Sequence, residues 1–137
     1  MGKNIAAGLA GIVSAGVLVW LVEMVGHSVY PPPAGLDFAD ADAMGAYVAT
    51  LPIGAFLFVG GAWFIATLGG TFIACKIGTA KPVIFASIVG GLMLIGTAFN
   101  LAMIPHPLWF SGLGIAGILV AAWLGMKLGG DKAAAAA

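Results

Sequence analysis

Two residues that can exchange protons lie one helical turn apart in the segment EMVGHSVYPPP, at the end of an otherwise apolar stretch: Glu23 and His27. A neighbouring carboxylate and imidazole can share a proton near neutral pH, or bind a divalent metal through one oxygen and one nitrogen. Two protein ligands make a weak metal site, so a metal would need His106 to swing in as a third ligand. The pair can instead be structural, an interaction that stabilises the helix.

Two further polar residues are expected at the same depth. Glu23 lies 18 residues after Ile5, or about 27 Å along a helix, and Asn100 lies equally far after Pro82. Because the apolar slab of a bilayer is about 30 Å thick, both residues fall near its outer boundary. Glu23 could bond Asn100 there and lock the helices together. The candidate polar site therefore consists of Glu23, His27, Asn100 and His106.

Aromatic residues join this layer. Tyr30 follows the first apolar stretch, Tyr47 precedes the second, and Trp109 follows His106 in the sequence PHPLW. The simplest expectation is that these three side chains belong to the aromatic belt found at membrane–water boundaries.

The composition defines the class of protein. Of the 137 residues, 62% are apolar and 7% are charged, and the mean hydropathy is +1.15. A soluble domain carries roughly 25% charged residues, so this chain is expected in a lipid bilayer. The absence of arginine and the net charge of zero exclude a phosphate-binding surface for nucleic acid. The lone cysteine, Cys75, excludes an internal disulfide.

Four stretches have the roughly 20 mostly apolar residues that a membrane span needs. We predict an all-α integral membrane protein, a compact bundle of four transmembrane helices at about 5–29, 51–75, 82–104 and 108–126. Residues 30–50 form an outer loop, whose end, AMGAYVATLP, is expected to be a helical lead-in that Pro52 loosens or kinks. The domain is expected to cover 1–132, followed by a low-complexity tail at 133–137.

The lysines predict the orientation. Four crossings put both termini and the turn after the second span on one side, which receives every basic residue: Lys3, Lys76, Lys81, Lys127 and Lys132. The long loop carries three acids and no lysine: Asp37, Asp40 and Asp42. Because basic residues of short loops stay in the cytoplasm, we expect both termini inside the cytoplasmic (inner) membrane and the long loop outside.

Small residues recur at a spacing of four in the predicted spans. Helices in lipid associate by close packing at such residues. The residues expected at these contacts are Gly11, Ala15, Ala66, Gly70, Gly90, Gly117 and Ala121. The contacts can lie inside the four-helix bundle or face other chains, and both can hold together.

Motifs for catalysis or cofactor binding are missing from the sequence. It contains no H-E-x-x-H, no paired Cys-x-x-Cys, no P-loop and no G-x-S-x-G with triad partners. The segment GLGIAG has the glycine spacing of a dinucleotide loop, but it sits inside a predicted span. We therefore expect no catalytic residue, no resident metal and no cofactor.

The motif EMVGHSVYPPP, the acidic loop after it and the segment YVATLP resemble a group of small bacterial four-span membrane proteins. The resemblance covers most of the chain. It implies the four-span topology and a prokaryotic origin, and the group carries no established activity.

Small size and many small residues favour a non-enzymatic role, as an accessory or structural subunit of a homo-oligomer or a larger membrane complex. The alternative is a small proton-coupled transporter or channel that uses the outward-facing Glu23, His27 and Asn100. An enzyme is the third expectation. Loss of the polar cluster discriminates among them, because only a structural subunit would keep its function.

Overall fold

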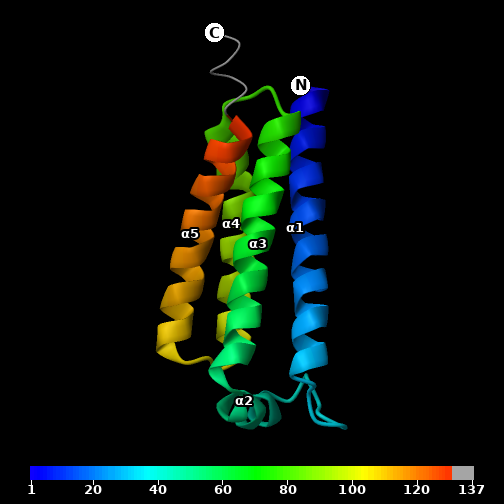
Figure 1. Ribbon diagram of the computed structural model, residues 1–137, viewed down its shortest axis with the longest axis vertical. Helices are drawn as coiled ribbons and strands as arrows, with labels where there is room; N and C mark the ends of the chain where they lie inside the picture. The colour runs from blue at the N-terminus through cyan, green and yellow to red at the C-terminus, as the bar shows by residue number, and fades with distance from the viewer. Residues whose placement is uncertain (131–137) are drawn as a thin grey trace.

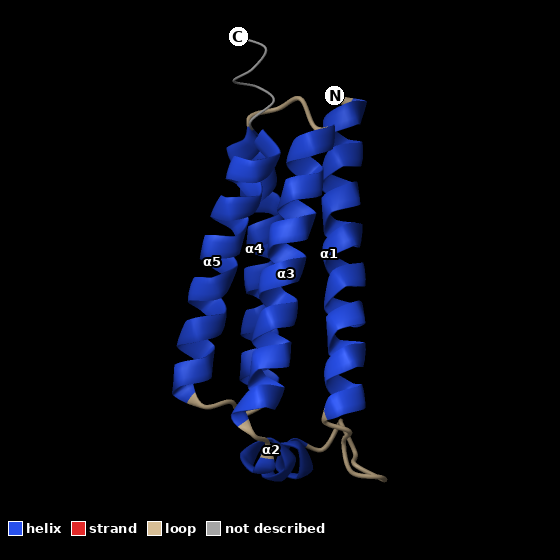
Figure 2. Cartoon of the chain, viewed as in Figure 1, coloured by secondary structure: helices blue, strands red, loops and turns tan. Residues whose placement is uncertain are grey.

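The computed structural model describes residues 1–130, and these residues form helices joined by turns and connections (Figure 2). The helices are α1 (Gly2–Val29), α2 (Ala41–Thr50), α3 (Ile53–Ile77), α4 (Pro82–Met103) and α5 (Leu108–Gly130). The four long helices are long and apolar enough to cross a membrane, which supports a multi-pass membrane protein. The predicted domain end at residue 132 and the tail at 133–137 lie outside the described residues.

The short helix α2 is a separate element and lies across one end of the bundle (Figure 1). Asp40 begins it, because its carboxylate accepts hydrogen bonds from the backbone N–H groups of Asp42 at 2.9 Å and Ala43 at 3.2 Å. Leu51 and Pro52 end it in extended conformation, with ψ of 135° and 159°. A residue that precedes proline is disfavoured in helical conformation. The junction at Pro52 is therefore a full break between two helices, and not the kink expected from the sequence.

The four long helices run side by side, with α2 at one end of the bundle and both ends of the described chain at the other (Figure 1). We call these the α2 end and the terminal end. Helix α3 is central: α1 and α5 both pack along it, and α4 packs mainly against α5. Between α1 and α4 there are few contacts. The ring of four helices is therefore incompletely closed on the side where α1 faces α4.

Helices α1 and α3 meet at small residues near the terminal end. A Cβ atom placed on Gly11 would lie 2.6 Å from the carbonyl oxygen of Gly70 and 2.8 Å from Cβ of Ala74. A Cβ atom on Gly70 would lie 2.6 Å from the carbonyl oxygen of Gly11 and 2.9 Å from Cβ of Ala15. Ala66, one turn before Gly70 and nearer the α2 end, is fully buried. Only glycine allows the two backbones to come this close.

Helix α5 packs on α3 in the same way. A Cβ atom on Gly125 would lie 2.6 Å from the carbonyl oxygen of Leu68, and Ala121 is fully buried. Gly117 faces more open space, since its nearest neighbour is the Phe64 ring at 3.8 Å. The close contacts of α5 therefore run through Ala121 and Gly125 rather than through Gly117. On α4, a Cβ atom at Gly90 would lie 3.0 Å from Cβ of Ala122 in α5.

The core changes character along the bundle. Toward the terminal end, the buried cluster is rich in alanine and holds one large ring, that of Phe85; its members are Ala7, Ala15, Ala66, Ala74, Cys75, Phe85 and Val89. Toward the α2 end, large side chains separate the helices; this second cluster consists of Met44, Val48, Phe56, Trp63, Phe110 and Ile118. Helices that are close at one end and spread at the other leave space at the spread end.

One side chain ties α1 to the turn between α3 and α4 at the terminal end. The Oδ1 atom of Asn4 accepts hydrogen bonds from the backbone N–H of Thr79 at 2.8 Å, from that of Ala80 at 3.0 Å and from the Thr79 hydroxyl at 3.1 Å. The first turn of α1 thereby holds the turn between α3 and α4.

Candidate functional site

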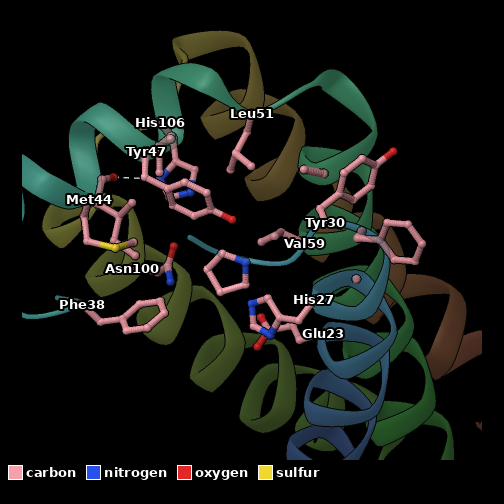
Figure 3. A pocket seen from close by; sticks show the side chains of 16 residues that line it. Glu23, His27, Tyr30, Phe38, Met44, Tyr47, Leu51, Val59, Asn100 and His106 are labelled. Atoms are coloured by element: carbon pink, nitrogen blue, oxygen red, sulfur yellow. Dashed lines mark hydrogen bonds between the residues drawn. The ribbon is translucent and has the colours of Figure 1, made fainter. Parts of the chain in front are cut away.

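The space at the α2 end is a pocket of about 250 Å³. Its walls come from α1, the connection after α1, α2, the start of α3, Asn100 of α4 and the connection before α5 (Figure 3). All four residues of the candidate polar site line it: Glu23, His27, Asn100 and His106. Chain segments that are far apart in sequence thus bring these polar groups to one cavity.

Glu23 and His27 form the α1 side of the pocket. They lie one turn apart, Glu23 is half-buried and His27 is exposed, and their side chains lie next to one another in Figure 3. None of the side-chain hydrogen bonds within residues 1–130 involves Glu23 or Asn100. The bond between Glu23 and Asn100 that would lock the bundle is therefore not formed, and the carboxylate is available to a ligand.

Asn100 contributes an unpaired amide. Its Oδ1 atom is buried and has no hydrogen-bond partner among residues 1–130. A buried acceptor without a partner costs about 1–3 kcal/mol relative to the same group in water. Rotation of the amide exchanges its oxygen and nitrogen, so Asn100 can offer either an acceptor or a donor to a molecule in the pocket.

His106 is fixed in place. Its Nδ1 atom lies 2.7 Å from the carbonyl oxygen of Ile104, and a carbonyl only accepts hydrogen bonds, so Nδ1 carries the proton. In the neutral ring Nε2 is then an acceptor. The ring stacks on Phe110 with centroids 5.1 Å apart and meets the edge of Phe56 at 6.3 Å. His106 is therefore a positioned acceptor that packing holds in its place.

A metal centre is not formed in this region. Within residues 1–130, no group of three or more His, Cys, Asp or Glu side chains could hold a metal ion. The hypothesis in which His106 swings in beside Glu23 and His27 around a divalent metal stays a prediction; in this structure the His106 ring stacks on Phe110.

Aromatic rings form much of the remaining wall. Tyr30, Phe38, Tyr47 and Phe58 all line the pocket, from the connection after α1, from α2 and from α3. Tyr30 meets Phe58 edge to face, with centroids 6.0 Å apart. The two tyrosines expected in a membrane belt thus also face the cavity. The ring of Trp109, by contrast, packs edge to face on that of Phe56, with centroids 5.7 Å apart.

Sequence reasoning missed Phe38 and Phe58 as lining residues. Phe38 is the only aromatic residue among the aspartates of the long connection, and its side chain is 64% exposed. An exposed phenylalanine in an acidic segment was an available signal. No such signal existed for Phe58, one of several phenylalanines in an apolar helix.

On the side of the pocket that faces the terminal end, the bundle is closed. Val89 of α4 fills the space beside the contact of Gly11 with Gly70, with its methyl groups 3.1–3.2 Å from the two Cβ positions. Val89 is fully buried. These contacts close the space between α1, α3 and α4 on the terminal side of the pocket.

A second, more open cavity lies on the outside of α4 and α5. Its volume is about 400 Å³, and small residues form much of its floor: Ala86, Ser87, Gly90, Gly91 and Ala122. No charged residue lines it. We call it the α4/α5 groove.

Comparison with known protein families, with curated proteins and with solved structures finds no match to this chain. The class of protein therefore comes from the fold and the site alone. The described residues form an all-α bundle with four helices long and apolar enough to cross a membrane, and with a polar and aromatic pocket at one end.

Proposed function

We propose that this chain is a non-enzymatic, solute-binding protein of a bacterial cytoplasmic membrane, with both termini in the cytoplasm and the pocket facing outward. The distribution of lysine supports the orientation, since Lys3, Lys76, Lys81 and Lys127 all belong to the terminal end. The outward pocket is then one access state of a small proton-coupled carrier.

A single observation carries this proposal: Glu23, His27, Asn100 and His106 share one pocket, and within residues 1–130 neither Glu23 nor Asn100 makes a side-chain hydrogen bond. Ionisable groups within spans are costly and often functional. A structural cluster would pair these groups with one another. Unpaired groups around a cavity are what a binding site offers to a ligand.

Proton coupling follows from the acid. A ligand that binds the Glu23 carboxylate competes with a proton for it, so ligand binding and proton release are coupled at this residue. The terminal half opposes passage in this state, because Gly11, Gly70 and Val89 close it. Transport therefore requires these helices to separate there while the α2 end closes.

The test is the recovery of a native ligand. The chain is purified gently from its own membranes and denatured, and the released small molecules are identified by mass spectrometry. We expect a species that wild type retains and Glu23→Gln loses. The matched control is Asp42→Asn, which removes an acid at the same end but outside the pocket. Equal release from wild type and Glu23→Gln, with both proteins folded, would contradict a binding role for Glu23.

An accessory or structural subunit is the second candidate, and the α4/α5 groove favours it. A groove floored by small residues and free of charge accepts a helix of a second copy at close range. Gly91 lines this groove and Gly96, on the same helix, does not, while a Cβ atom at either position meets nothing within 4 Å. Gly91→Leu is expected to reduce assembly size in native mass spectrometry, and Gly96→Leu to leave it unchanged. The same size for both variants would exclude the groove as an interface.

A further inference from the structure

The charge of the pocket selects the kind of ligand. Among residues 1–130, Glu23 is the one acid that lines it, and no lysine does. The connection and the start of α2 beside it add three aspartates, Asp37, Asp40 and Asp42, so this end of the bundle is negative. An anion would be repelled by the Glu23 carboxylate, while a cation finds a counter-ion there.

The aromatic rings narrow the choice among cations. Tyr30, Phe38, Tyr47 and Phe58 line the same cavity from separate segments. The faces of such rings attract cations, most of all organic ammonium groups that shed their hydration easily. A small hydrated metal ion would instead need several oxygen or nitrogen ligands, and no suitable group of three exists within residues 1–130.

The rest of the lining is apolar, with Val48, Leu51, Val59 and Ile104 among its members. An apolar wall stabilises an apolar ligand body through burial of its surface. A carboxylate, several aromatic rings and an apolar wall together match a molecule that has one positive charge on a hydrophobic frame.

We infer that the ligand is an amphipathic organic cation, such as an alkylated or aryl-substituted ammonium, with its charge at Glu23 among the aromatic rings and its apolar body against α2 and α3. This inference rests on the proposed function, because it names the ligand class of the same pocket.

The experiment uses three probes of matched shape on the full chain in detergent, with calorimetry as the readout. Benzyltrimethylammonium is the cation, neopentylbenzene is its neutral isostere with carbon in place of nitrogen, and phenylmethanesulfonate is the anion. We expect the cation to bind at least about tenfold more tightly than either other probe, a difference of about 1.4 kcal/mol. The isostere separates charge from shape, since the two molecules fill the same space.

Variants then assign the selectivity to residues. Glu23→Gln is expected to lower cation affinity about tenfold while leaving the neutral probe unchanged, because it removes charge and keeps shape. Phe38→Leu is expected to lower cation affinity about two- to fivefold, the effect of one exposed cation–π contact. Asp42→Asn, outside the pocket, is expected to change it less than about twofold, since exposed charges are screened by salt.

Several results would overturn the inference. These are equal binding of the cation and its neutral isostere, preference for the anion, no binding of any probe, or cation affinity unchanged in Glu23→Gln. The proposed binding function and the ligand class are tested by different results. A neutral or anionic native ligand that Glu23→Gln loses would leave the pocket a binding site and refute only the ligand class.

Discussion

The contact between Gly11 and Gly70 gives a sharp test of the packing. A Cβ atom at Gly11 would lie 2.6 Å from the Gly70 carbonyl oxygen, whereas ordinary contacts begin at 3.4 Å. In Gly11→Ala, helices α1 and α3 must therefore separate by about 0.8 Å, the difference between these distances. The obstructing atom belongs to the backbone, so no side-chain rotation relieves it. Overpacking of this kind costs about 1–3 kcal/mol, and we expect the upper half of that range.

The matched control is Gly16→Ala on the same helix. Gly16 is exposed, and a Cβ atom there meets nothing within 4 Å. Its replacement removes a helix-interior glycine, which changes stability by up to about 1 kcal/mol in the favourable direction. The two variants add the same methyl group to α1, so the difference between them isolates the contact with α3. We expect this difference to be at least about 2 kcal/mol.

The assay is unfolding in mixed micelles as the fraction of denaturing detergent is raised, followed by tryptophan fluorescence. A second variant, Gly70→Ala, adds a methyl group to the other side of the same contact. Once the helices have separated for one methyl group, the second has room, so the double variant should lose less stability than the sum of the single variants. Equal stability of Gly11→Ala and Gly16→Ala would refute the close approach of α1 to α3.

Three further predictions concern the two ends of the bundle. Cys75 is buried and would resist labelling from either side, so orientation is tested with single cysteines introduced into Cys75→Ala. In intact cells, an impermeant maleimide should label the Asp40→Cys variant and spare the Lys81→Cys variant. The opposite labelling pattern would invert the topology. Asn4→Ala should lower the free energy of unfolding by about 0.5–1.5 kcal/mol, since water replaces part of three hydrogen bonds. Asn4→Asp keeps the acceptor oxygen and should lower the free energy of unfolding less. Equal losses in the two variants would show that the acceptor does not matter. Affinity for benzyltrimethylammonium should fall on acidification as a proton occupies Glu23, and should level off about tenfold lower, the loss expected for Glu23→Gln. His27, His106, Tyr30 and Tyr47 also line the pocket, and an affinity independent of pH in wild type would contradict competition at the carboxylate.

The four long helices follow from the sequence because they depend on hydropathy and length alone. Pro82 and the break before Leu108 mark their limits, and the structure begins α4 and α5 at these residues. The separate course of α2 depends on local backbone chemistry at Asp40 and Pro52, which is visible in the sequence. Its position across the bundle depends on which helices spread apart, and this follows from side-chain sizes in several helices at once.

The pocket was partly predictable, because the depth of a residue along a membrane helix can be counted from the sequence. Equal depth along two helices puts Glu23 and Asn100 at one level, but it does not say that both face inward, since the rotation of each helix is set by its packing. The contacts of Gly11 in α1 and of Gly90 in α4 contribute to those rotations. The contribution of Phe58 was hidden, because a phenylalanine in an apolar helix has no pattern that separates a lining residue from a lipid-facing one.

The partnership of α1 with α3 has a consequence for biosynthesis. In the proposed topology α1 enters the bilayer before α3, the helix that it packs against. It has no contact with α3 until the long connection, α2 and α3 have been synthesised. During that interval the Glu23 and His27 side chains and the small-residue stripe at Gly11 face lipid. The insertion of α1 must therefore depend on its own apolarity, and its hydropathy of 2.3 is the highest of the four spans. Selection on α1 thus acts at the translocon as well as in the finished protein, and a polar substitution that the assembled bundle would tolerate can still prevent the chain from being made.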